Sequence, residues 1–132
     1  MRYLIDTNIW LEILLDQEKS EEASEFLSNI DSNLLAISDF SLHSIILILT
    51  KLKEYKTAKM FLNDINNSGV NILTIKYKNL DKVIDIINQF NIDFDDAYQY
   101  YLSKEYKLIL ISFDKDFDKT DIKRKTPTDF IK

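Results

Sequence analysis

The 132-residue chain contains no cysteine, only one glycine and only one proline. Without cysteine it can form neither disulfides nor thiolate metal sites. The scarcity of glycine and proline implies turns built largely from Asn, Asp and Ser. The longest apolar run, residues 45–49, is far too short to span a bilayer, and the N-terminal residues read as a strand and not as a secretory signal. We therefore expect a protein of the cytoplasm with no membrane association.

The composition is that of a soluble globular domain, with 45% hydrophobic and 30% charged residues. The length suits one compact domain spanning residues 1–132. The net charge of −5 makes the chain as a whole a poor non-specific binder of nucleic acid. A nucleic-acid function would therefore need a local basic patch or a bound metal ion.

Short apolar stretches alternate with segments of helical apolar spacing along the whole chain. The expected strands are residues 3–5, 34–37, 71–75, 108–112 and, at an edge, 122–125. The expected helices are residues 9–15, 21–30, 39–53, 56–66, 79–90 and 94–106. Residues 45–49 could also form a core strand, but they lie in a longer run without turn residues. Strands that are apolar on both faces predict a three-layer α/β/α domain with a central parallel sheet of four to five short strands.

Acidic residues are concentrated near one predicted edge of this sheet. Asp6 directly follows the first strand, and Asp114 follows the fourth, with Asp116 two residues on. Further acids begin the helix at 94–106, namely Asp93, Asp95 and Asp96. Ligands of open parallel sheets bind beyond the carboxyl ends of the strands. Clustered carboxylates repel one another and are unfavourable unless a cation joins them, and Mg²⁺ and Mn²⁺ prefer such oxygens.

Each acid also has an ordinary structural explanation. Asp6 could be the N-cap of the following helix, and Asp95 and Asp96 suit a helix N-terminus through the helix dipole. The segment 114–116 could be a solvated turn. It is the coincidence of all these acids on one edge that favours a metal site.

Three of these strings resemble the acidic motifs of PIN domains: "LIDTN", "FDDAYQYY" and "LISFDKDF". The resemblance covers essentially the whole chain, in order and at normal spacing. It implies a sheet between helices, with Mg²⁺ or Mn²⁺ bound by Asp6, Asp96 and Asp114. It also implies a metal-dependent endoribonuclease like the VapC-type toxins, which are paired with an antitoxin protein.

The same resemblance assigns the remaining polar residues. Asp96 is preferred to Asp95 as the ligand because the family motif has an Asp directly followed by Ala, here Ala97. Ser112 matches a Thr or Ser that supports the first acid, and Asn8 matches a small polar residue near the site. The residues expected to support the site are Asn8, Asp95, Ser112 and Asp116.

One position departs from the pattern. PIN nucleases usually carry a glutamate early in the helix after the second strand, where this chain has His43, and the nearest acid is Asp39, about one turn earlier. The string "SDFSLHS" resembles a prokaryotic PIN subgroup with histidine at this place. His43 could form a local hydrogen bond, bind a softer ion such as Mn²⁺, or transfer a proton near neutral pH. A decayed site with weakened Mg²⁺ binding is a fourth interpretation.

The leading hypothesis is a toxin-like ribonuclease with Asp6, His43, Asp96 and Asp114 as catalytic residues and RNA as substrate. The rivals are a non-catalytic module that binds RNA or a protein partner, and a structural subunit whose acids only cap helices. The basic stretch 119–125 could contact RNA or be a solvated edge. Tyrosines of the helix at 94–106 could stack on bases or pack in the core, and we also expect a homodimer.

Overall fold

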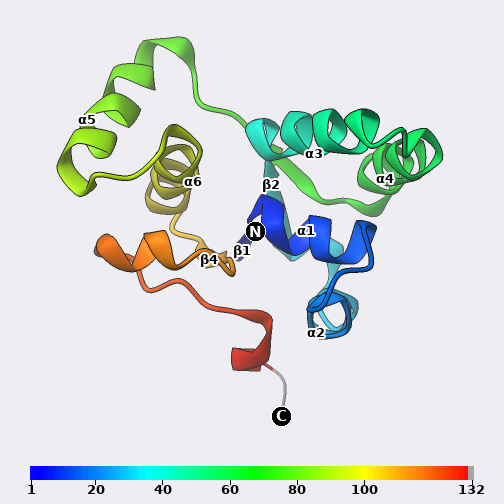
Figure 1. Ribbon diagram of the computed structural model, residues 1–132. Coiled ribbons are helices and arrows are strands. Elements are labelled where there is room, and N and C mark those ends of the chain that lie inside the picture. Colours follow the sequence, from blue (N-terminus) through cyan, green and yellow to red (C-terminus); the bar gives the residue numbers. More distant parts are fainter. Residues whose placement is uncertain (131–132) are drawn as a thin grey trace.

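Four short parallel strands lie at the centre of the molecule, and the structure, a computed structural model, describes residues 1–130. The strands are β1 (Tyr3–Ile5), β2 (Leu35–Ser38), β3 (Asn71–Leu73) and β4 (Ile109–Ile111), in the spatial order β3-β2-β1-β4. Six helices surround them: α1 (Thr7–Leu14), α2 (Ser20–Ser28), α3 (Asp39–Lys51), α4 (Tyr55–Ser68), α5 (Leu80–Phe90) and α6 (Phe94–Glu105). In Figure 1, α5 and α6 lie on one side of the sheet and α1 to α4 on the other. The expected α/β/α fold is confirmed.

The two faces of the sheet carry separate cores because successive side chains of a strand point to opposite faces. Tyr3 and Ile5 of β1 pack with residues of α1 to α4, whereas Leu4 packs with residues of α5 and α6. All three are buried. A strand that is covered on both faces must be apolar at every position, which explains why the strands read as continuous apolar runs.

Capping side chains fix where the helices begin beyond the strands. Ser38 ends β2, and its Oγ accepts a hydrogen bond from the Ser41 N–H at 2.9 Å at the start of α3. Asp6 does the same for α1 by accepting from the Thr7 N–H at 2.9 Å. Such a cap satisfies one of the N–H groups that a helix leaves unpaired in its first turn.

The turns only partly use the residues expected of them. Gly69 ends α4 in the left-handed conformation, with φ of 87°, and Asp16 and Asn91 adopt it as predicted. However, Lys53 and Lys107 also take positive φ values, of 59° and 55°. Lysine has no side-chain oxygen to favour that conformation, so the packing of the adjoining elements must impose it.

The helix ends agree with the predicted ones to within two residues, and residues 45–49 are helical, inside α3. Strand β3 is shorter than predicted because the chain turns away after Leu73, where the Ile75 N–H donates to the Tyr98 hydroxyl at 3.0 Å. The predicted strand at 122–125 is only a bridge to β4, between Ile111 and Lys125. No helix within residues 1–130 combines the length and apolarity needed to cross a membrane.

The fold predicts a large contrast between two isoleucines that are neighbours in the sheet. Ile37 and Ile72 are paired in register, but Ile37 is fully buried and Ile72 is 48% exposed. Ile37→Ala should lower the free energy of unfolding by about 2–5 kcal/mol, through lost burial and the cavity left behind. Ile72→Ala should cost less than about 1 kcal/mol. Urea denaturation of both variants measures the contrast, and equal losses would contradict the described packing.

Candidate metal centre

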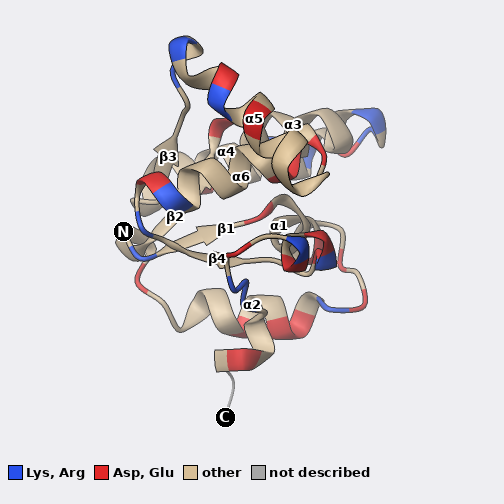
Figure 2. Cartoon of the chain, turned by 90° about the vertical axis from the view of Figure 1, so that its left-hand side faces the viewer, with Lys and Arg blue, Asp and Glu red and all other residues tan. Residues whose placement is uncertain are grey.

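The first acid of the candidate site is held by the register of the sheet. Ile5 of β1 pairs with Ile111 of β4, so the residues that follow them, Asp6 and Ser112, lie side by side where the two strands end. The Asp6 N–H donates to the Ile111 carbonyl at 2.9 Å, which extends the pairing. Figure 2 shows acidic residues where the chain leaves β1. The carboxyl edge of the sheet therefore carries the predicted acid.

Both oxygens of Asp6 are occupied by hydrogen-bond donors. Oδ1 accepts from the Thr7 N–H and from Gln99 Nε2, each at 2.9 Å. Oδ2 accepts from the Ser112 hydroxyl at 2.6 Å and from Asn8 Nδ2 at 3.3 Å. A carboxylate offers about four lone pairs, so this buried carboxylate is fully hydrogen-bonded and fixed in orientation.

Burial nevertheless has the largest effect on the pKa of Asp6. Loss of solvent raises the pKa of its carboxyl, and the charge of Asp114 raises it further. The hydrogen bonds from Ser112, Gln99 and Thr7 act in the opposite direction and are outweighed. A buried carboxylate that resists ionisation in this way becomes favourable as an anion when a cation is close.

The carboxylates that converge most closely are those of Asp96, Asp114 and Asp116. One oxygen from each lies within 4.8 Å of the other two. Neighbouring oxygens bound about 2.1 Å from an octahedral Mg²⁺ are about 3 Å apart, so a contraction of at most about 2 Å would bring the three into one coordination shell. Oxygen-only donors suit Mg²⁺ or Mn²⁺. The residues present therefore fit a hard divalent cation.

Local structure explains why these three side chains meet. Asp96 is in the first turn of α6 and is 4% exposed. Asp114 begins a 3-10 helix after β4, where its Oδ1 accepts from the Asp116 N–H at 2.8 Å. The Asp114 N–H in turn donates to Ser112 Oγ at 2.9 Å, which ties this loop to the same hydroxyl that contacts Asp6.

The electrostatics of Asp96 show how unfavourable this convergence is without a cation. Burial raises the pKa of Asp96 to about 8, with further contributions from the charges of Asp95, Asp114 and Asp6. The exposed Asp95 thus acts on the site through its charge. Of the three converging acids, only Asp116 forms a salt bridge within residues 1–130, with Lys119 at 3.7 Å. This pair is half-exposed and therefore weak.

Sequence reasoning missed Gln99. It is 2% exposed, and its Nε2 donates both to Asp6 and to Ser41 Oγ, the latter at 2.9 Å. Its Oε1 has no hydrogen-bond partner among residues 1–130. Because Gln99 follows Asp96 by three residues, the two lie on the same side of α6. The spacing of three residues from Asp96 was the available signal.

Asn8 is hydrogen-bonded at the ends of β1 and β4, whereas His43 lies on the exposed surface of α3. Asn8 links the strand ends, with Nδ2 3.2 Å from Ser112 Oγ and Oδ1 accepting from the Phe113 N–H at 3.1 Å. His43 is exposed on α3 and lines a hollow with Phe40, Ser44 and Leu47. Within residues 1–130, His43 is not one of the ligands that converge with Asp96.

Asp39, the other acid near His43, belongs to a different contact. Its Oδ1 accepts from the Tyr98 hydroxyl at 2.7 Å, and its Oδ2 accepts from the Thr74 hydroxyl at 2.8 Å. These bonds join the start of α3 to α6 and to the segment after β3. Asp39 therefore does not take the place of the glutamate expected in this helix.

The structure is thus a parallel α/β/α domain with carboxylates that converge at the carboxyl edge of the sheet and could hold a metal ion. The model of the PIN domain family matches residues 3–123. The chain belongs to the PIN domain family. A search of the curated proteins found no match.

Several solved structures share the fold. The VapC20 toxin of Mycobacterium tuberculosis, described as cleaving the sarcin-ricin loop, aligns with a TM-score of 0.82 at 13% identity, over 95% of this chain and 99% of the other. A toxin-antitoxin complex from Klebsiella pneumoniae aligns with a TM-score of 0.73 at 22% identity, over 95% and 97%. FitAcB from Neisseria gonorrhoeae aligns with a TM-score of 0.74 at 18% identity, over 96% and 98%.

The raised pKa of Asp96 makes a pH-dependent prediction about stability. In the unfolded chain this carboxyl ionises near 3.8, but in the folded protein it ionises at about 8. Between these values the unfolded state binds fewer protons, so the free energy of unfolding falls as the pH rises. In EDTA, Asp96→Asn should therefore raise the melting temperature by a few degrees, more at pH 8 than at pH 5.

Addition of Mn²⁺ provides the second half of this test. We expect Mn²⁺ to raise the melting temperature of the wild type at pH 8, by linkage to binding of the folded state, and Asp96→Asn to lose most of that shift. The matched control is Asp85→Asn on α5, where the aspartate is exposed. A wild-type melting temperature that does not change when Mn²⁺ is added would refute the metal centre.

Proposed function

We propose that this protein is a toxin-like, Mg²⁺- or Mn²⁺-dependent endoribonuclease that hydrolyses RNA phosphodiester bonds. The convergence of the Asp96, Asp114 and Asp116 oxygens carries this proposal, because it is a ready set of ligands for a hard cation. Membership of the PIN family and the fold shared with VapC20 support the choice of RNA as substrate. The whole chain, residues 1–132, is proposed to act as one domain in the cytoplasm.

In this proposal Asp96, Asp114 and Asp116 hold the ion, and Asp6 joins them by giving up its 3.3 Å hydrogen bond from Asn8. A bound divalent ion acidifies a water molecule and neutralises the charge that develops on a phosphate. Asp6 is kept in position by Ser112, Asn8 and Gln99, so its orientation is set before any ligand arrives. Orienting partners of this kind commonly affect metal affinity or activity by about 10–100-fold.

His43 is proposed to contact the RNA and not the ion. Its imidazole is exposed, and it lies outside the converging carboxylates. A histidine beside a bound phosphodiester can donate a hydrogen bond or transfer a proton near neutral pH. The missing family glutamate then reduces the negative charge of the centre, which weakens Mg²⁺ more than the softer Mn²⁺.

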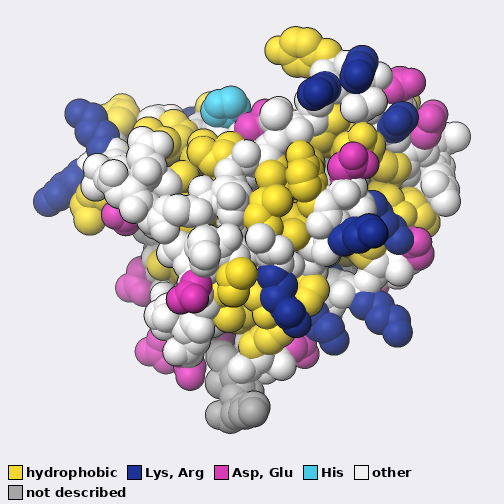
Figure 3. Space-filling view, turned by 180° about the vertical axis from the view of Figure 1, so that it is seen from behind, with side chains coloured by type: hydrophobic (Ala, Val, Ile, Leu, Met, Phe, Trp, Pro, Cys, Tyr) yellow, Lys and Arg dark blue, Asp and Glu magenta, His cyan; other side chains and the backbone are white. Residues whose placement is uncertain are grey.

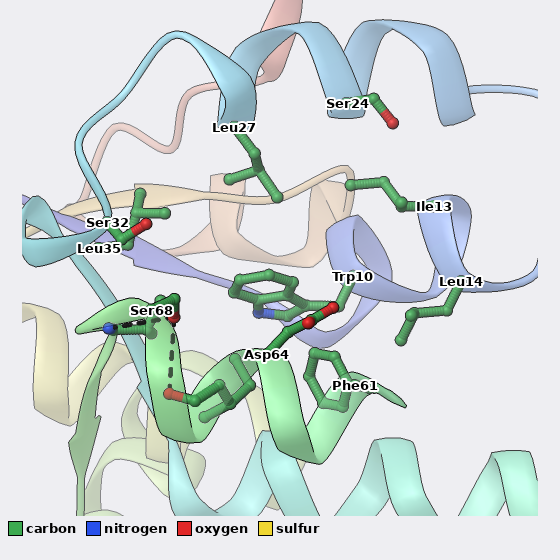
Figure 4. A pocket seen from close by; sticks show the side chains of 12 residues that line it. Trp10, Ile13, Leu14, Ser24, Leu27, Ser32, Leu35, Phe61, Asp64 and Ser68 are labelled. Atoms are coloured by element: carbon green, nitrogen blue, oxygen red, sulfur yellow. Dashed lines mark hydrogen bonds between the residues drawn. The ribbon is translucent and has the colours of Figure 1, made fainter. Parts of the chain in front are cut away.

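A protein partner, such as an antitoxin, is proposed to occupy an apolar hollow of about 310 Å³ between α1, α2 and α4 (Figure 4). Figure 4 shows Trp10 and Phe61 on one side of this hollow and Leu27 on the other. The lining is mostly apolar, with Asp64 at its rim. An amphipathic partner segment with a basic residue matches this chemistry, and the Klebsiella chain is described as part of a toxin-antitoxin complex.

A homodimer is proposed through the exposed apolar residues of α3 and α5. Leu47 is 53% exposed, Ile84 is 61% exposed, and Tyr77, just before α5, is 92% exposed. Phe40 lines one hollow with Leu47 and another with Tyr77, and an exposed apolar surface that continues in this way is more typical of an interface than of a solvated surface.

A second candidate function is a catalytically impaired module that binds RNA or a protein partner. The full hydrogen-bonding of Asp6 and the exposed position of His43 favour it. Tight RNA retention without cleavage in either Mg²⁺ or Mn²⁺ would select this alternative.

Cleavage of a labelled RNA should require the acidic centre. With Mn²⁺ present, Asp6→Asn and Asp114→Asn should each reduce the cleavage rate at least ~100-fold, because each loses a metal-binding or metal-orienting carboxylate. Asp85→Asn, purified in the same way, should cleave like the wild type. Equal cleavage by all four proteins would identify a contaminating nuclease and reject the proposal.

His43→Ala separates contact with substrate from contact with metal. We expect it to leave the Mn²⁺-induced rise in melting temperature unchanged and to reduce the cleavage rate by ~10²-fold or more, the usual contribution of a group that transfers protons. Asp85→Asn on α5, which is exposed and does not line the hollow of His43, is the control. Loss of the Mn²⁺ effect would instead make His43 a ligand, and an unchanged rate would remove it from the mechanism.

A further inference from the structure

A second hollow, of about 390 Å³, runs along β4, from Leu108 before the strand to Lys125, which pairs with Ile111 at its end. It is formed by the C-terminal end of α6, the start of β4, the segment 122–125 and Phe130. Figure 3 views the molecule from behind, and there lysine and arginine side chains gather beside hydrophobic ones. Neither the proposed cleavage site nor the apolar partner hollow includes these residues.

Four exposed lysines line this hollow: Lys104, Lys107, Lys123 and Lys125. Lys104 is paired with Asp121 at 2.8 Å, whereas within residues 1–130 the other three form no salt bridge. Such a concentration of positive charge is unexpected in a chain with a net charge of −5. The hollow is therefore a locally basic site on an acidic protein.

The placement of these lysines follows from two separate segments. Lysines at the end of α6 are expected there because they complement the helix dipole. That argument does not extend to Lys123 and Lys125, which belong to the extended segment beside β4. Arg124 between them turns the other way and contacts Asp118 at 3.1 Å and the Ser112 carbonyl at 3.2 Å. Lys123 and Lys125 therefore line the hollow, together with Ile122, whereas Arg124 does not.

A buried hydroxyl in the same hollow lacks a partner. Ser103 is 4% exposed and lines the hollow, and within residues 1–130 its Oγ makes no hydrogen bond. Buried polar groups are nearly always hydrogen-bonded, so an unpaired hydroxyl in a hollow that four lysines also line indicates a missing acceptor. An anionic oxygen would accept from Ser103 and from the lysines together. Leu108, Ile122 and Phe130 give the hollow an apolar lining against which a ribose or base could pack.

We propose that this lysine hollow binds the phosphate backbone of a single-stranded RNA whose neighbouring nucleotides lie at the acidic centre. The inference rests on the proposed function. The hollow follows β4, whose three residues span about 10 Å, and Lys125 pairs with Ile111 directly before Ser112 of the acidic centre, so a few nucleotides reach from one to the other. An acidic centre repels RNA phosphates, so affinity must come from cations elsewhere, and lysine acts on phosphate as a point charge. The hollow gives affinity and direction to the strand without reading its sequence.

The test is RNA binding measured by fluorescence anisotropy in EDTA, where no cleavage occurs. The probe is a labelled, unstructured 12-nucleotide RNA, and the variant is Lys123→Gln with Lys125→Gln. Its matched control is Lys56→Gln with Lys59→Gln, which removes the same charge from exposed positions on α4. We expect the first pair to weaken binding roughly tenfold and to reduce the slope of log K against log salt by about 1.4, and the control to change binding less than twofold.

Two further measurements test whether the hollow binds RNA and not an acidic peptide. Ser103→Ala should weaken RNA binding several-fold while leaving the melting temperature unchanged, since it removes no internal hydrogen bond. A poly-aspartate peptide of equal charge should compete poorly with the RNA. Equal weakening by both lysine pairs, or equal competition by the peptide, would overturn the RNA hollow. Because binding is read without metal, these results stand apart from whether the acidic variants abolish cleavage.

Discussion

The mutual repulsion of carboxylates in a buried place is the constraint on which this account depends. Asp96 is almost fully enclosed, yet the charges of Asp95, Asp114 and Asp6 all act on it. In water these charges would be screened, but burial removes that screening. The folded chain therefore keeps an arrangement that is unfavourable by itself and becomes favourable when a divalent cation joins it. A protein whose acids served only as helix caps would have no reason to place them within reach of one another.

The pairing of β1 with β4 determines where the acidic residues at the end of the sheet lie. The register between β1 and β4 sets Asp6 beside Ser112, and a single hydroxyl then links Asp6, Asn8 and the backbone of Asp114. The centre is thus built from two adjacent strand ends, the 3-10 helix that follows β4 and the first turn of α6. The same strand β4 borders both the acidic centre and the lysine hollow. In the proposed complex the lysines attract the RNA phosphates that the carboxylates repel.

Much of the fold followed from the sequence because its signals are local. Helical spacing, capping residues such as Ser38, and doubly apolar strands set the order and ends of most elements. The predicted strand at 122–125 was wrong because its backbone bonds depend on a distant partner, Ile111, and its apolar content could not reveal how far the pairing continues. The left-handed turns at Lys53 and Lys107 were equally hidden, since packing and not side-chain chemistry imposes them.

For the site, the sequence indicated which acids gather at one edge but not their geometry. From the sequence Asp116 was expected only to support the site, whereas the structure brings Asp116 together with Asp96 and Asp114. The hydrogen bond from Gln99 to Asp6 joins residues 93 positions apart, so no local pattern could predict it.

The most direct measurement is a crystal structure grown with Mn²⁺, with anomalous diffraction recorded at the manganese edge. The account predicts a strong anomalous peak within bonding distance of the Asp96 and Asp114 carboxylates. A map without a peak there, at saturating Mn²⁺ and pH 8, would contradict it.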